Sequence, residues 1–223
     1  MNEKIFYGID LVWCIDGTRT PMMENMLNVI KNNASHFWQS YLNAMKLEGK
    51  DVGSVRVKVI VFRDLKYHPV GIEESRFFKM PEEEQLLVQH VRDIELTVGN
   101  ENTNYGLEAF ATALKSKWNN KEQRNRNIIV LFSDKEAYQL NAKKDLPIYP
   151  SNMPTDLAQL GAWWEGEEAF NETYIAKNGR LVCFVPSGYP WNEITGWNRY
   201  WPTFIKDKEL SFQEVIDILT GSF

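Results

Sequence analysis

The stretch Tyr7-Gly-Ile-Asp-Leu-Val-Trp-Cys-Ile-Asp-Gly-Thr-Arg-Thr-Pro-Met-Met23 decides the fold. Its first half is apolar and predicts a buried strand over residues 5–15. The strand gives way to the loop Asp16-Gly-Thr-Arg-Thr20, and Pro21 suits the first turn of a helix because its missing N–H is not needed there. A polar loop at the carboxyl end of a buried strand is where open α/β sheets bind ligands.

Short apolar strands alternate with helical segments along the rest of the chain. We expect strands at 55–62, 74–78, 128–134 and 180–186, and helices at 21–45, from 81, at 105–118, at 157–164 and from 211. The turn Pro69-Val-Gly71 predicts a hairpin, which would add one antiparallel edge strand. The sequence therefore predicts a single α/β domain over residues 1–223, with a doubly wound, mostly parallel central sheet and helices on both faces.

Composition limits the partners that this chain is expected to bind. The net charge of −5 does not favour capture of nucleic acid. No apolar run approaches the roughly 18 residues that a membrane span needs, and no secretion signal is visible, so we expect a cytoplasmic protein. Cys14 and Cys183 lie in apolar runs and are expected to be buried reduced thiols, although a disulfide between two strands is geometrically possible.

Three loops carry oxygen donors after strands or before helices: 16–20, 101–105 and 133–134. In a doubly wound sheet the carboxyl ends of parallel strands face one edge, so these loops are expected to converge there. Asp16, Thr18 and Thr20 supply the hard oxygen ligands that Mg²⁺ and Mn²⁺ prefer. The pattern predicts a metal-binding loop, although Asp and Thr are also common helix caps.

The combination resembles the metal-ion-dependent adhesion site of the von Willebrand factor type A domain. Asp16-x-Thr18-x-Thr20 is similar to the family signature Asp-x-Ser/Thr-x-Ser/Thr, and the strand ending in Asp134 is similar to the later strand whose aspartate completes the metal shell. The resemblance covers most of the chain in the right order and is strongest to stand-alone intracellular members from bacteria. It implies the fold expected above.

The loop and helix at 99–109 resemble the segment that lies between those two motifs in the family. By this alignment Thr103 matches the threonine ligand of the family, with Glu101 and Asn102 as competing candidates. Arg19, Asn102 and Glu136 flank the proposed ligands and are the candidate partner-binding residues. Glu136 has two readings, a water-mediated metal contact or a solvated loop acid.

The resemblance implies a binding function and no catalysis. The bound Mg²⁺ or Mn²⁺ keeps an open position that an acidic residue of a protein partner fills. Bacterial relatives accompany kinases, phosphatases or stress-response components, so the implied setting is a cytoplasmic stress-response, signalling or defence system. Two departures would weaken the metal site: Arg19 replaces a small residue, and Thr20 replaces the commoner serine.

Two other functions compete with this hypothesis. The first is a haloacid-dehalogenase-like Mg²⁺ phosphatase, whose Asp-x-Asp-Gly-Thr loop would need an acidic nucleophile where this chain has Cys14. The second is a metal-free scaffold that binds through aromatic residues near the carboxyl terminus, because Trp is favoured at interface hot spots. Those tryptophans are equally expected as core residues: Trp163, Trp164, Trp191, Trp197 and Trp201. Arg63-Asp64 has two readings also, a functional pair at the mouth of the site or a salt-bridged strand end.

Overall fold

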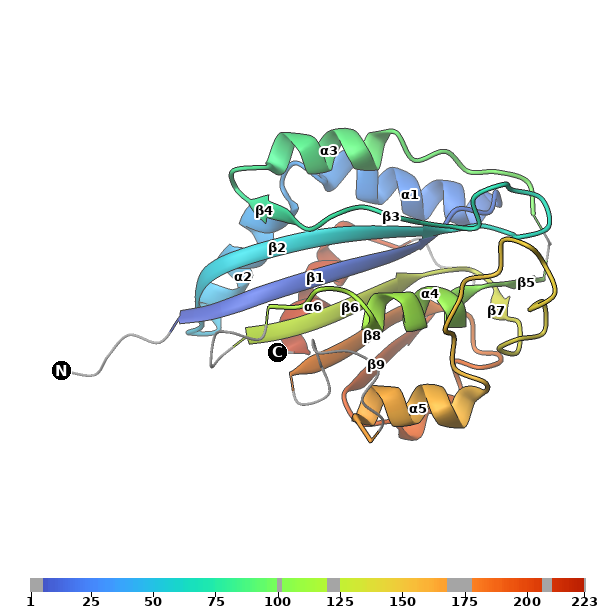
Figure 1. The fold of residues 1–223 in the computed structure, drawn as a ribbon. Helices are drawn as coiled ribbons and strands as arrows, with labels where there is room; N and C mark the ends of the chain where they lie inside the picture. The colour runs from blue at the N-terminus through green and yellow to red at the C-terminus, as the bar shows by residue number, and fades with distance from the viewer. Residues whose placement is uncertain (1–5, 100–101, 120–124, 168–177, 206–209, 223) are drawn as a thin grey trace.

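The computed structural model describes residues 6–99, 102–119, 125–167, 178–205 and 210–222, and its main feature is a seven-stranded sheet (Figure 1). The sheet order is β3-β2-β1-β6-β8-β9, with β4 also paired to β2. The strands are β1 (Phe6–Asp16), β2 (Asp51–Phe62), β3 (Ile72–Glu74), β4 (Phe78–Met80), β6 (Asn125–Phe132), β8 (Gly179–Val185) and β9 (Tyr200–Phe204). β1 pairs in parallel with β2 and β6, and the sheet continues in parallel through β8 to β9. β3 and β4 pair with β2 in the antiparallel sense.

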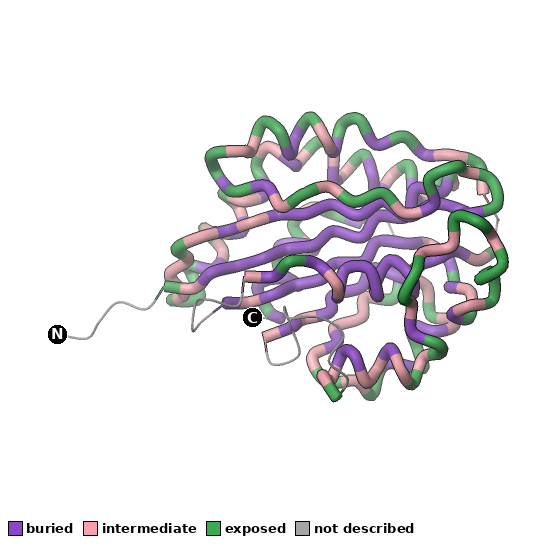
Figure 2. Tube along the Cα trace, viewed as in Figure 1, coloured by how far each residue is buried: buried purple, intermediate pink, exposed green. Residues whose placement is uncertain are grey.

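Helices cover both faces of the sheet, as the alternation of strands and helices predicts. One face packs against α1 (Pro21–Asn33), α2 (Phe37–Leu47), α3 (Glu84–Arg92) and α6 (Phe212–Gly221). The other packs against α4 (Gly106–Leu114), α5 (Leu157–Glu165) and the short helix η1 (Glu193–Gly196). Alternate residues of β1 therefore enter different cores, and Figure 2 shows the central strands buried along most of their length. The α/β fold predicted from the sequence is confirmed.

Several element boundaries differ from the sequence-based expectation. The helix expected at 21–45 is two helices, because the chain bends at 34–36. After the bend, Phe37 packs edge-on against Trp13, with the two ring centroids 4.8 Å apart. The edge strand expected at 74–78 is interrupted into β3 and β4, and Ser75 bonds the backbone of β2 between them. The helix expected from Pro81 begins at Glu84, after a turn. β9 lies outside the strands expected from the sequence, which predicts its aromatic residues either as a binding surface or as core residues.

The two cysteines lie on strands that β6 separates. Cys14 of β1 and Cys183 of β8 both pair with Leu131 of β6. Two strand spacings amount to about 10 Å, which is beyond the reach of a disulfide. Both are free and buried, so the expectation of reduced thiols is confirmed and the alternative of a disulfide is wrong.

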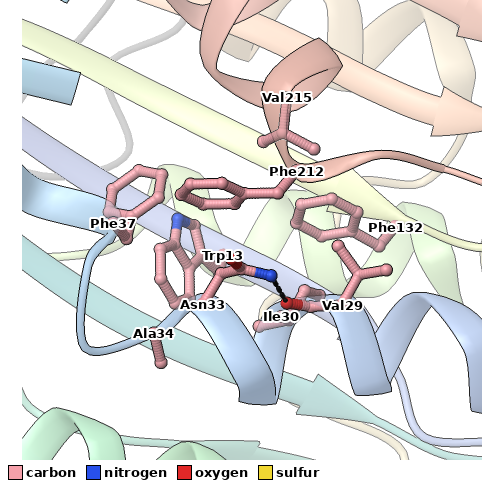
Figure 3. Close-up of a pocket in the computed structure, with 9 residues that line it drawn as sticks. All are labelled: Trp13, Val29, Ile30, Asn33, Ala34, Phe37, Phe132, Phe212 and Val215. Carbon is pink, nitrogen blue, oxygen red and sulfur yellow. Dashed lines mark hydrogen bonds between the residues drawn. The ribbon is translucent and has the colours of Figure 1, made fainter. Parts of the chain in front are cut away.

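A narrow apolar cleft lies between α1 and α6 above the sheet (Figure 3). Four aromatic side chains line it, together with aliphatic residues of α1 and α6: Trp13, Phe37, Phe132 and Phe212. Its free volume is about 20 Å³, which is about enough for one water molecule. The cleft is therefore a narrow gap where the two helices pack together.

None of the helices in the described part of the chain is long and apolar enough to cross a membrane.

Candidate functional site

The 16–20 loop is held between the end of β2 and the segment that follows α3. The Gly17 N–H donates to the Phe62 carbonyl at 2.8 Å, and the Thr97 N–H donates to the Gly17 carbonyl at 2.8 Å. A side chain at position 17 would clash, because a Cβ there would lie 2.8 Å from Cγ of Arg63. Glycine therefore lets the loop pass close to the end of β2.

Asp16 is the buried centre of the site. Its Oδ1 accepts the Thr18 N–H at 2.8 Å, and its Oδ2 accepts the Asn104 amide at 2.7 Å and the Ser133 hydroxyl at 3.1 Å. Burial raises the pKa of Asp16, against the lowering effect of hydrogen bonds from Thr18 and Asn104 and of the positive charge of Lys135. A divalent cation nearby would oppose this burial cost by favouring the charged carboxylate.

Thr20 joins the loop to the second aspartate. As the N-cap of α1 its hydroxyl accepts the Met23 N–H at 3.0 Å, and it donates to Oδ2 of Asp134 at 2.5 Å. The other carboxylate oxygen, Oδ1 of Asp134, is buried and has no hydrogen-bond partner among the described residues. A buried carboxylate oxygen without a donor is costly unless a cation or water contacts it.

These residues fit a hard divalent cation. Two carboxylates, Asp16 and Asp134, lie beside the hydroxyl-bearing residues Thr18, Thr20 and Ser133, and oxygen ligands of this kind suit Mg²⁺ or Mn²⁺. Within the described residues no group of three or more His, Cys, Asp or Glu side chains could hold a metal. Any metal here would therefore depend on two carboxylates and several neutral oxygens.

The 102–104 segment reaches the site through a residue that sequence reasoning missed. β5 (Thr103–Asn104) pairs with β7 (Glu136–Ala137), which places Thr103 opposite Glu136. Asn104, one residue later, donates its amide to Asp16 and to Ser133, at 2.7 and 2.5 Å. Its side-chain oxygen accepts the Gly106 N–H at 3.0 Å. An asparagine just before a helix is a common cap, and that signal was available in the sequence.

The predicted ligand at this loop stays a prediction. Thr103 is adjacent to Asn104 and half-buried at the edge of the site. Asn102 is described and exposed, whereas Glu101, the other candidate, lies outside the described residues.

The two remaining partner-binding candidates lie on different sides of the site. Arg19 donates to the Leu96 carbonyl at 3.1 Å and lies 4.0 Å from Glu24, so its guanidinium lies between the first turn of α1 and the segment after α3. Glu136 is exposed and lies against Gly188, where a Cβ would come within 2.2 Å of its carboxylate. Both are at the carboxyl edge, and their role in binding a partner stays a prediction.

Arg63 and Asp64 bond to different residues. Arg63 forms an ion pair with Glu73 at 3.1 Å, as expected for a salt-bridged strand end. Asp64 is buried, and its Oδ1 accepts the Lys66 N–H at 2.9 Å.

Cys14 and the tryptophans belong to the core. Cys14 is fully buried, burial raises its thiol pKa, and its Sγ lies 3.9 Å from the Ala109 carbonyl. Trp163, Trp164 and Trp191 are buried in the core under α4 and α5, and Trp197 packs against it. Trp201 is partly buried against the opposite core. Their main contribution is packing, which agrees with the expectation that these tryptophans are core residues.

We expect Gly99→Ala to distort the 16–20 loop. A Cβ at position 99 would lie 2.6 Å from Cγ2 of Thr18 and 3.0 Å from Cβ of Asp64, so Thr18 must move. Overpacking of this kind typically costs about 1–3 kcal/mol of folding free energy. Urea denaturation measures the loss. Gly196→Ala is the matched control, because a Cβ there meets nothing within 4 Å. Equal stability of the two variants would contradict the prediction.

Comparison with known proteins gives likeness of fold without likeness of sequence. No protein-family model matches the chain, and no curated protein matches its sequence. A von Willebrand factor type A structure from Catenulispora acidiphila aligns over 97% of this chain and 43% of its own, with a TM-score of 0.55 and 8% identity. The open conformation of the pilus adhesin SpaC from Lactobacillus rhamnosus GG aligns over 98% of this chain and 30% of its own, with a TM-score of 0.52 and 10% identity. The chain thus spans less than half of either protein, and the level of similarity establishes the fold alone: this chain has a von Willebrand factor type A-like fold.

Proposed function

We propose that the chain is a protein-interaction module that binds an acidic residue of its partner through Mg²⁺ or Mn²⁺ at Asp16, Thr18, Thr20, Thr103 and Asp134. The observation that carries this proposal is the convergence of Asp16 and Asp134, from the ends of β1 and β6, with a buried Asp134 oxygen that has no hydrogen-bond partner among the described residues. A metal held by two carboxylates and neutral hydroxyls retains enough positive charge to attract one more carboxylate.

The proposed function is binding and not catalysis. Cys14 occupies the position that a phosphatase of the competing type needs for its nucleophile, and its thiol is enclosed by the core. The proposal includes a cytoplasmic setting in a bacterial stress-response, signalling or defence system, which rests on the resemblance of the sequence. The alternative of an aromatic binding surface is weakened by the burial of three of the five tryptophans.

The proposal predicts that Mg²⁺ or Mn²⁺ stabilises the folded chain. At a metal concentration 100 times the Kd, the free energy of unfolding rises by about 2.7 kcal/mol. Thermal unfolding with MgCl₂, MnCl₂ or EDTA measures this rise. Asp16→Ala and Asp134→Ala should both lose it, because each removes one of the two carboxylates.

Asp145→Ala is the matched control, because it removes an exposed carboxylate from the loop at the same edge of the sheet. It should keep the full response to metal. Absence of any response in the wild-type chain would refute metal-dependent adhesion. Hydrolysis of a generic phosphate ester that depends on Asp16 would instead restore the phosphatase.

A further inference from the structure

A pocket of about 300 Å³ opens beside the candidate metal site. Tyr67, Tyr105 and Tyr138 line it, and we refer to it as the tyrosine pocket. It lies between the turn after β2 and the segment after β7, two loops that Figure 1 shows at the end of the sheet where β1, β2 and β6 finish. A cavity of about 150 Å³ already accommodates a benzene ring, so the pocket has room for a large side chain.

The tyrosine pocket and the metal site share structural elements. Tyr105 follows Asn104, whose amide donates to Asp16, and the Tyr138 N–H donates to the Asn104 carbonyl at 2.8 Å. On the other side, Asp64 in the pocket wall and Thr18 both lie within 3.0 Å of the Cβ position at Gly99. The tyrosine pocket therefore adjoins the candidate metal site through shared walls.

The walls of the pocket are aromatic and its rim is basic. The Tyr105 and Tyr138 rings lie 5.1 Å apart and pack against each other. Tyr105 is buried and forms the floor of the pocket, whereas Tyr67 is exposed and Tyr138 is partly exposed, so these two rings can contact an incoming ring. Nζ of Lys66 lies 5.2 Å from the Tyr67 ring, and Nζ of Lys143 lies 5.5 Å from the Tyr138 ring. Neither ammonium forms an ion pair within the part of the chain that the structure describes. The one acidic residue in the lining is Asp64, which is buried and accepts a hydrogen bond from the backbone N–H of Lys66.

We propose that the tyrosine pocket recognises an aromatic side chain next to the acidic residue that binds the metal, with a further acidic residue of the partner at the lysine rim. The partner is then a protein with an acidic, aromatic peptide segment. This inference rests on the proposed function, because the metal fixes the first acidic residue. The pocket supplies the sequence preference that a metal–carboxylate contact alone does not give.

Short blocked peptides test the proposal. The probes are acetyl-Asp-Phe-amide and acetyl-Phe-Asp-amide, with acetyl-Asp-Gly-amide as the reference, titrated into the isotope-labelled chain with MgCl₂ or EDTA and followed by NMR shifts. With MgCl₂, we expect one of the two phenylalanine peptides to bind about tenfold more tightly than the reference, because a ring enters an apolar pocket. Tyr67→Ala should remove this gain, and because its side chain is 54% exposed the variant should still fold.

The rim is tested with acetyl-Asp-Phe-Glu-amide and its reverse sequence. The added acid should tighten binding about threefold, as expected for an exposed ion pair. Lys143→Ala should lose this gain, whereas Lys144→Ala, which changes an exposed lysine outside the pocket lining, should keep it.

The outcomes separate the pocket from the metal. Equal binding of the glycine and phenylalanine peptides in MgCl₂ overturns the pocket and leaves metal-dependent adhesion standing. A gain from phenylalanine that persists in EDTA and disappears in Tyr67→Ala supports the pocket and refutes the metal. Failure of every peptide to bind overturns the pocket also.

Discussion

Trp191→Ala is expected to lower the free energy of unfolding by about 3–5 kcal/mol, the range for truncation of a large buried aromatic residue. Trp191 is fully buried, and its ring lies 2.9 Å from the Cβ position at Gly106, where α4 begins. Its indole N–H donates to the Lys135 carbonyl at 3.1 Å, one residue beyond Asp134. The side chain therefore supports both α4 and the loop that carries the second aspartate. Urea denaturation measures the change.

Trp191→Phe is the matched control for the hydrogen bond. It keeps an aromatic ring in the core and removes the donor to Lys135, so its cost should be well below that of Trp191→Ala. A loss of less than about 1 kcal/mol in Trp191→Ala, which is small for a core truncation, would show that the surrounding core collapses into the cavity.

Glu108→Gln is expected to make the chain more stable than wild type at neutral and alkaline pH. Glu108 on α4 is buried, and burial raises its pKa from 4.5 to about 7, against the lowering effect of the hydrogen bond from Tyr149 at 2.7 Å. Glutamine keeps an oxygen for that bond and has no charge to bury. The expected difference at pH 8 is about 3 kcal/mol, because one pKa unit corresponds to about 1.4 kcal/mol.

The sign of the pH dependence follows from the raised pKa. In the folded chain Glu108 holds its proton up to about pH 7, whereas in the unfolded chain it loses the proton near 4.5. Its contribution to stability is thus complete below pH 4.5 and is lost as the pH rises to about 7. Urea denaturation of both proteins from pH 4 to 8 gives the difference curve. If the difference in unfolding free energy between the two proteins did not change with pH, the raised pKa of Glu108 would be contradicted.

The sequence predicted those parts of the fold that depend on local patterns. β1 and β6 contain the apolar runs 11–15 and 128–132, which end directly before Asp16 and shortly before Asp134, and such runs are recognisable as buried strands without any tertiary information. Because parallel strands end at one edge of the sheet, the proximity of the two aspartates followed directly. The edge strand was predicted in outline, but its interruption depends on how Ser75 bonds to β2.

The parts that the sequence missed depend on contacts between distant residues. The break between α1 and α2 allows Phe37 to meet Trp13 on the sheet, and β9 adds to the sheet only because β8 offers a free edge. Periodicity within a segment cannot reveal either contact. The same limit applies to the tryptophans, whose burial depends on packing between elements on the two faces of the sheet.

The sequence alone determined the α/β alternation and the two aspartates at the carboxyl edge, because apolar periodicity and loop composition are local properties. The tertiary structure alone decided that Asn104 bonds to Asp16, that Arg19 bonds to the segment after α3, and that a tyrosine pocket lies beside the site. These features arise where segments separated by tens of residues pack together. Where such segments pack together, each side chain points in the direction that the surrounding residues leave open. Those residues come from distant parts of the chain, so the local sequence does not identify them.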